Sequence, residues 1–103
     1  MTIKNDEILK ALDKMRGGPL TFGKMIESIR KCDEISQVDL AKQMNISRAH
    51  LCDIEKGRRI VSLSRAIEFA KVLGYSHTQF AAKVLEDQAR EVGLKVKITV
   101  TAA

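Results

Sequence analysis

Apolar residues recur every three or four positions along most of the chain, as they do in helices that bury one face in a core. One such series is Leu63, Ala66, Ile67, Ala70 and Leu73. Residues that can cap a helix precede these series, and glycine or asparagine follows several of them. The pattern predicts helices over residues 5–16, 21–32, 36–44, 47–56, 62–73 and 76–92.

Two of these predicted helices, 36–44 and 47–56, are separated by a very short turn. Ser36 is followed three residues later by Asp39, which is a capping-box pattern. Asn45 tolerates the left-handed conformation that ends many helices, and Ser47 can cap the helix that follows. Ile46, between them, is expected to be buried. The segment is therefore predicted to form a tight helix-turn-helix.

The spacing of apolar residues changes near the end of the chain. From Leu94 to Thr101 apolar residues alternate with Lys and Thr, and most of them are β-branched. This pattern predicts a strand. A lone strand leaves its backbone N–H and C=O groups unpaired, so we expect it to pair with the same strand of a second subunit. The predicted dimerisation residues are Leu94, Val96, Ile98 and Val100.

Composition favours a single, mainly helical domain with an anionic partner. The 103 residues are 45% hydrophobic and 30% charged, with a net charge of +5. Residues 21–75 carry ten Lys or Arg and seven Asp or Glu, so this part supplies +3 of the total. The longest apolar run is only Phe80 to Ala82, and four charges lie in the first ten residues. We therefore expect a cytoplasmic protein without a signal peptide or membrane segment.

Catalytic and metal-binding residue patterns are weak. Cys32 and Cys52 lie twenty positions apart with no paired spacing, and His50 and His77 are the two histidines. His50 and Cys52 would diverge on a helix, so a thiol sensor or metal site built from these four residues is disfavoured. Without a glycine-rich phosphate loop or a placed acid pair, we expect neither an enzyme nor a cofactor.

The segment from Ser36 to Tyr75 resembles the Cro and phage-repressor type of helix-turn-helix, also called the XRE family. The matching positions are Gln37, Leu40-Ala41, Ile46-Ser47 and Ile54-Glu55-Lys56-Gly57, and the resemblance extends over residues 22–80. It implies an all-α, lambda-repressor-like five-helix DNA-binding domain. To this domain the chain would add an N-terminal helix and a short C-terminal β-strand.

The resemblance also implies which residues contact DNA bases. They lie on the outer face of the predicted helix 47–56 and are Ser47, Arg48, Ala49 and Asp53, with Cys52 beside them. Arg48 can pair with guanine, Ala49 can contact a thymine methyl group, and Asp53 can accept from cytosine. A carboxylate near phosphates is repelled, so Asp53 pairing with Lys56 remains an equal alternative.

Further roles follow from the same resemblance. Phosphate contacts fall on Ser36, Gln37, Lys56, Arg58 and Arg59. A buried structural ion pair is expected between Arg30 and Glu55. The chain is thus divided into an N-terminal helix with a Gly-Gly-Pro linker (1–20), a helix-turn-helix domain (21–75) and a dimerisation element (76–103).

Two functions are compatible with these features. The first is a sequence-specific transcriptional regulator, a repressor that binds a palindromic operator in double-stranded DNA as a homodimer. The alternative is an antitoxin that neutralises a toxin protein and represses its own operon. In that case the N-terminal helix or the C-terminal strand would bind the toxin.

Overall fold

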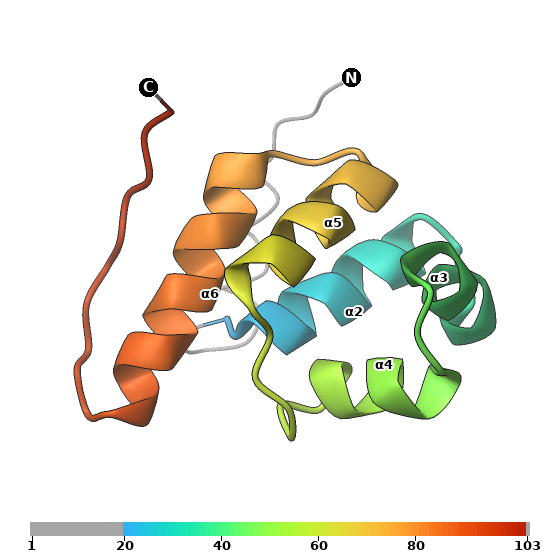
Figure 1. Cartoon of the computed structure of the whole chain (residues 1–103), viewed down its shortest axis with the longest axis horizontal. Helices are drawn as coiled ribbons and strands as arrows, with labels where there is room; N and C mark the ends of the chain where they lie inside the picture. The colour runs from blue at the N-terminus through green and yellow to red at the C-terminus, as the bar shows by residue number, and fades with distance from the viewer. Residues whose placement is uncertain (1–19, 103) are drawn as a thin grey trace.

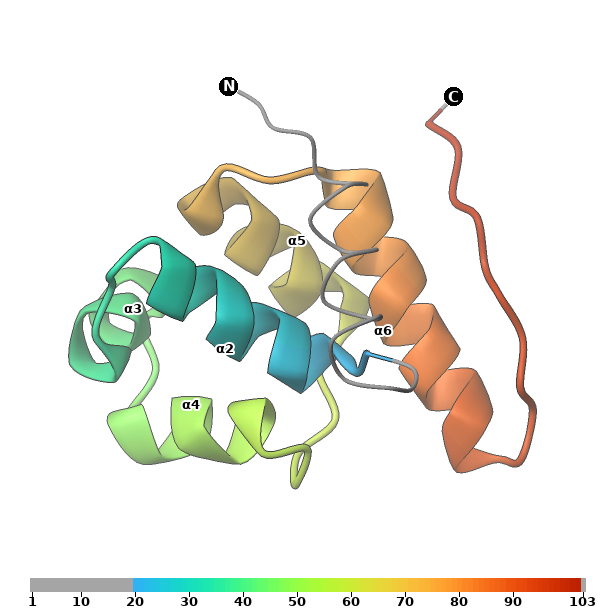
Figure 2. The same ribbon diagram turned by 180° about the vertical axis from the view of Figure 1, so that it is seen from behind.

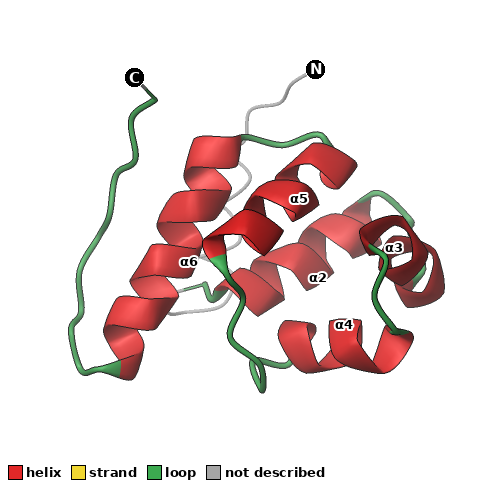
Figure 3. Ribbon diagram, in the orientation of Figure 1, coloured by secondary structure: helices red, strands yellow, loops and turns green. Residues whose placement is uncertain are grey.

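The computed structural model describes residues 20–102, and the helix predicted over 5–16 lies outside this range. The described part is all-helical, without a strand (Figures 1 and 3). Its helices are α2 (Phe22–Cys32), α3 (Gln37–Met44), α4 (Arg48–Glu55), α5 (Leu63–Leu73) and α6 (His77–Glu91). An all-helical architecture of five helices is therefore confirmed for the described residues, with α6 lying in the part predicted as the dimerisation element.

Hydroxyl side chains begin all five described helices. Each one accepts a hydrogen bond from the backbone amide three residues later, which satisfies one of the free N–H groups of the first turn. These N-cap residues are Thr21, Ser36, Ser47, Ser62 and Ser76. Asn45 and Gly74 end α3 and α5 in the left-handed conformation, at φ 59° and 78°. The capping residues thus account for how closely the sequence predicts the helix boundaries.

Aromatic residues from three helices meet in the core. The ring of Phe22 packs edge-on against those of Phe69 and Phe80, with centroids 5.8 Å apart in both pairs. Tyr75 stacks on Phe80 at 6.1 Å. This cluster joins the start of α2 to α5 and α6, and it is surrounded by buried aliphatic side chains. It leaves α3 and α4 together on one side of the molecule (Figure 1).

The helix-turn-helix is held by close backbone packing. Gly23 lies where α2 crosses the end of α4, and a Cβ at this position would come within 2.1 Å of the Ile54 carbonyl oxygen. Ala41 of α3 is buried, and its carbonyl accepts from the amide of Ile46 in the turn. Small residues therefore allow α2, α3 and α4 to approach one another.

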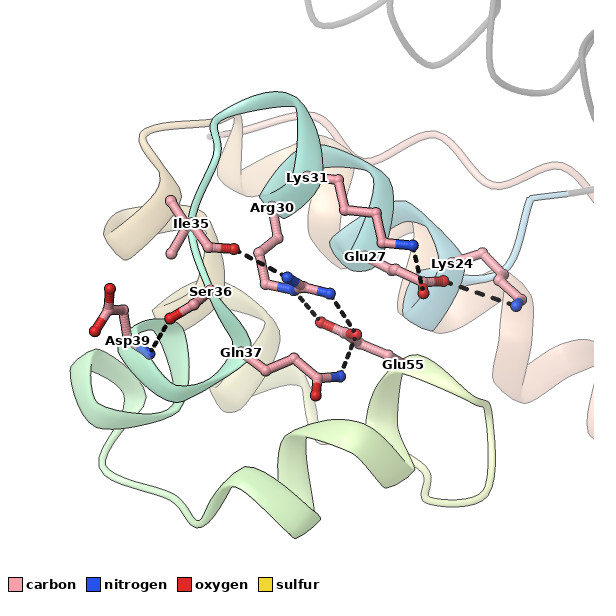
Figure 4. A network of polar contacts seen from close by, with 9 residues as sticks. All are labelled: Lys24, Glu27, Arg30, Lys31, Ile35, Ser36, Gln37, Asp39 and Glu55. Carbon is pink, nitrogen blue, oxygen red and sulfur yellow. Dashed lines mark hydrogen bonds and ion pairs between the residues drawn. The ribbon is translucent and has the colours of Figure 1, made fainter.

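An ion pair with almost no exposure joins α2 to α4 (Figure 4). The Nε and Nη2 atoms of Arg30 donate to the two carboxylate oxygens of Glu55 at 2.8 and 3.2 Å. Arg30 also donates to the Ile35 carbonyl, and Gln37 at the start of α3 donates to Glu55 at 2.9 Å. Because each charge has several hydrogen-bond partners, the pair is compatible with burial.

The predicted C-terminal strand is not formed in this single chain. Residues 94–102 run as an extended segment alongside α6 (Figures 1 and 2). A strand requires a neighbouring strand for its backbone hydrogen bonds, and no such neighbour is present within residues 20–102. Instead, the Ile98 amide donates to the Glu86 carboxylate at 2.8 Å.

We expect Gly23→Ala to destabilise the fold strongly, because the new methyl group meets backbone atoms of α4 that cannot rotate away. Overpacking of this kind costs about 1–3 kcal/mol or more. Urea unfolding followed by circular dichroism measures the loss. Gly57→Ala is a useful comparison, since space is open at that position but its φ of +77° strains a side chain. A larger loss for Gly57→Ala would contradict the role of packing at Gly23.

Glu55→Ala is expected to reduce the free energy of unfolding by roughly 3–5 kcal/mol, because it leaves the buried Arg30 charge without its partner. Thermal and urea denaturation measure this loss. Glu27→Ala is the matched control, since Glu27 forms its ion pairs with Lys24 and Lys31 near the surface and should lose about 1 kcal/mol or less. Equal losses in the two variants would show that the buried pair has no special structural role.

Candidate nucleic-acid interface

Helix α4 buries one face and exposes the other. Leu51, Ile54 and Glu55 are buried against the neighbouring helices. The predicted base-contacting residues are on the other side: Ser47, Arg48 and Ala49 are exposed, and Cys52 and Asp53 are partly exposed. The structure therefore brings these five residues to one accessible surface, with Arg48 in the first turn of the helix.

Asp53 pairs with Arg58 rather than with Lys56. The Asp53 carboxylate lies 3.3 Å from the Arg58 Nε atom, and the Arg58 amide donates to the Asp53 carbonyl at 2.9 Å. Gly57, at φ +77°, turns the chain so that Arg58 comes back beside the last turn of α4. In the free protein, one predicted base contact and one predicted phosphate contact therefore bind each other.

The predicted phosphate contacts lie in two places. Lys56, Arg58 and Arg59 are exposed in the loop after α4. Ser36 and Gln37 lie at the N-terminus of α3 and have structural partners (Figure 4). The Ser36 hydroxyl accepts from the Asp39 amide, while the Gln37 amide group donates to Glu55. Gln37 therefore links α3 to the buried ion pair.

Positive charges around His50 extend this surface towards α5. Burial, followed by the nearby charges of Arg59 and Arg65, lowers the pKa of His50, and the opposing effect of Asp53 is smaller. Arg65 lies in the first turn of α5, where the helix dipole disfavours a cation. The sequence analysis did not predict that Arg65 lies near His50.

The remaining candidate chemistry is sparse within residues 20–102. Cys32 and Cys52 are free thiols, the first exposed and the second partly so. No three His, Cys, Asp or Glu side chains of this described part gather as metal ligands. None of its helices has the length and apolar character needed to cross a membrane.

Comparison with known proteins agrees with this geometry. A family model described as helix-turn-helix matches residues 26–80, which is more than half of the chain. The immunity repressor protein of Bacillus phage phi105 is 44% identical over 55 residues. That alignment covers 53% of this chain and only 38% of the phage protein. The chain therefore belongs to the helix-turn-helix family, of the Cro and phage-repressor (XRE) type.

Proposed function

We propose that this protein is a sequence-specific transcriptional repressor that binds a palindromic DNA operator as a homodimer. The observation that carries the proposal is the exposed outer face of α4, which has Arg48 in its first turn and a buried ion pair behind it. In helix-turn-helix proteins such a helix enters the major groove with its N-terminal residues at the base edges. The phage relative with similar sequence is named an immunity repressor, which favours repression over activation.

Base reading and phosphate binding fall to different residues in this proposal. Ser47, Arg48 and Ala49 lie at the end of α4 that would meet the bases, and Cys52 and Asp53 lie one turn later. Lys56 and Arg59 are exposed beyond the other end of α4 and would contact the backbone on one side. Ser36 would contact it on the other side, from the N-terminus of α3. This arrangement resembles a reading helix with flanking phosphate contacts.

Asp53 and Arg58 require a separate interpretation because they pair in the free protein. We propose that the pair neutralises the carboxylate, which would otherwise repel the DNA backbone. Arg58 would then support α4 rather than add a full positive charge to the surface. Arg59, which has no ion-pair partner within residues 20–102, is the stronger candidate for a phosphate contact.

The homodimer is proposed from the C-terminal segment. Leu94 and Val96 are exposed large apolar residues, and Ile98 and Val100 are partly buried beside α6. A second copy would cover these side chains and supply the missing strand partner. Two α4 helices could then meet half-sites of a palindrome about 34 Å apart, one turn of DNA.

Arg48→Ala should weaken operator binding by about 1–3 kcal/mol and relax the preference at one base pair, because a bidentate contact with a base is lost. The operator is first selected from random DNA, and affinities for it and for single-base variants are then measured by fluorescence anisotropy.

Arg59→Ala is the matched comparison, since it removes the same charge from the proposed phosphate contact. It should weaken operator and random DNA alike and reduce the slope of log affinity against log salt by about one. If each variant loses as much affinity for random DNA as for the operator, Arg48 does not read bases, and the proposed division between base reading and phosphate binding is wrong.

Deletion of the residues after Gly93 should yield a folded monomer, because α6 and the aromatic core remain intact. Multi-angle light scattering measures the mass, and a mobility shift measures operator binding, which should be much weaker than that of the full chain. A truncated protein that remains dimeric would place the dimer interface elsewhere.

A further inference from the structure

Beyond the turn at Leu94, one backbone hydrogen bond attaches the C-terminal segment (residues 94–102) to α6, at Ile98 near the middle of the segment. After α6, the Leu94 amide donates back to the Ala89 carbonyl, and the chain then turns to run beside the helix (Figures 1 and 2). Between Lys95 and Ala102, the Ile98 amide is the only backbone group with a hydrogen bond inside residues 20–102. Most of the backbone donors and acceptors of this segment are therefore available.

The point of attachment is itself well anchored. Glu86, which accepts from Ile98, also pairs with Lys83 one turn earlier on α6 at 3.5 Å. The side chains of Lys83 and Glu86 are only 14% and 13% exposed. Neighbouring N–H groups in an extended chain point to opposite sides. Since the Ile98 amide faces α6, the backbone groups of Lys97 and Thr99 face the open side.

We infer that two copies of this chain pair their C-terminal segments as antiparallel strands in one register, with the two-fold axis at Ile98. This inference rests on the proposed homodimer and specifies its interface. The Ile98 residues of the two copies lie opposite each other, and Lys97 of each copy exchanges backbone hydrogen bonds with Thr99 of the other. The strand of the second copy thus pairs with the free backbone edge and covers the exposed apolar side chains.

Charge is the first argument for this register. With the axis at Ile98, Lys97 faces Thr99 of the second copy, and Lys95 faces Thr101. Moving the axis to Lys97 places two Lys97 side chains opposite each other, and moving it to Val96 places Lys95 against Lys97 twice. Like charges directly opposite on neighbouring strands are destabilising. The earlier registers are therefore disfavoured.

Apolar pairing disfavours the registers in which the two-fold axis lies after Ile98. With the axis at Ile98, Val96 faces Val100 of the second copy and Leu94 faces Ala102, so every apolar position of the segment has an apolar partner. With the axis at Thr99, Val96 would face the small Ala102, and Leu94 would face no residue of the described segment 94–102. Leu94 is 56% exposed and Val96 is 46% exposed in the single chain, so within this segment these two side chains would bury the most apolar surface in the dimer. Among the registers with the axis at Val96, Lys97, Ile98 or Thr99, only the one at Ile98 keeps the lysines apart and gives every apolar residue of segment 94–102 an apolar partner.

Disulfide trapping tests the register directly in the full-length chain with Cys32→Ser and Cys52→Ser. Ile98→Cys should form a covalent dimer under mild oxidation, because opposite residues in a non-hydrogen-bonded pair have Cβ atoms about 4.5–5.5 Å apart. Val96→Cys alone should not, since two copies of that residue would lie four residues, about 13 Å, apart. Val96→Cys combined with Val100→Cys should form the dimer again. Non-reducing gels report the products.

The outcomes separate the register from the proposed function. Trapping by Val96→Cys but not by Ile98→Cys would overturn the register while leaving the dimer in place. A dimer in light scattering that none of these variants traps would place the interface outside the C-terminal segment, and the inference would be wrong. A monomeric parent protein at micromolar concentration would overturn both the homodimer and the register, whereas DNA binding by α4 is measured independently in the mobility shift.

Charge substitutions at Thr99 give a second test without cysteine chemistry. Thr99→Glu should tighten the dimer and Thr99→Lys should weaken it, each by about 2- to 30-fold, because the two-fold axis creates two pairs with Lys97. Sedimentation equilibrium at low and high salt measures both dissociation constants, and salt should reduce both effects. Gln43→Lys is the control, because it adds the same charge at an exposed position of α3 and should leave the dissociation constant of the dimer unchanged. Equal dissociation constants for Thr99→Glu and Thr99→Lys would contradict the register.

Discussion

The geometry of the helix-turn-helix depends on one buried carboxylate. Glu55, at the end of α4, accepts from Arg30 of α2 and from Gln37 of α3, so three helices meet at the same side chain. Hydrophobic contacts alone would allow α4 to slide or rotate, since aliphatic packing has little directionality. A bidentate guanidinium and an amide donor instead define the position of Glu55 closely. The direction of the exposed face of α4 follows from this.

Ion pairing also determines which charges remain exposed around α4. Arg30 and Glu55 neutralise each other in the interior, so their charges add little to the field at the surface. Asp53 is matched by Arg58 at the edge of α4. The exposed positive charges that remain on and beside α4 lie at both ends of the helix, with Arg48 at its start and Lys56 and Arg59 after it. This distribution suits a helix whose flanks contact an anionic polymer.

Local sequence signals predicted the helices well and the contacts between side chains less well. Ser36, Ser47 and Ser62 act within one turn, so their capping roles can be read from neighbouring residues. The partner of Asp53 depends on how Gly57 redirects the chain, and helical spacing alone pointed to Lys56 instead. The nearness of Arg65 to His50 was not predicted, because it arises from packing between α4 and α5 rather than from local sequence.

The C-terminal segment shows a second limit of prediction from the sequence. Its alternation of apolar and polar residues is a property of the sequence, but a strand is a property of a pair. In the single chain, α6 offers the segment one carboxylate, Glu86, and no ladder of backbone groups, so the segment is extended without being a strand. Strand formation and dimerisation would therefore be one event. Each copy's backbone would be satisfied only by the other, and the spacing of two α4 helices would be set by the same hydrogen bonds.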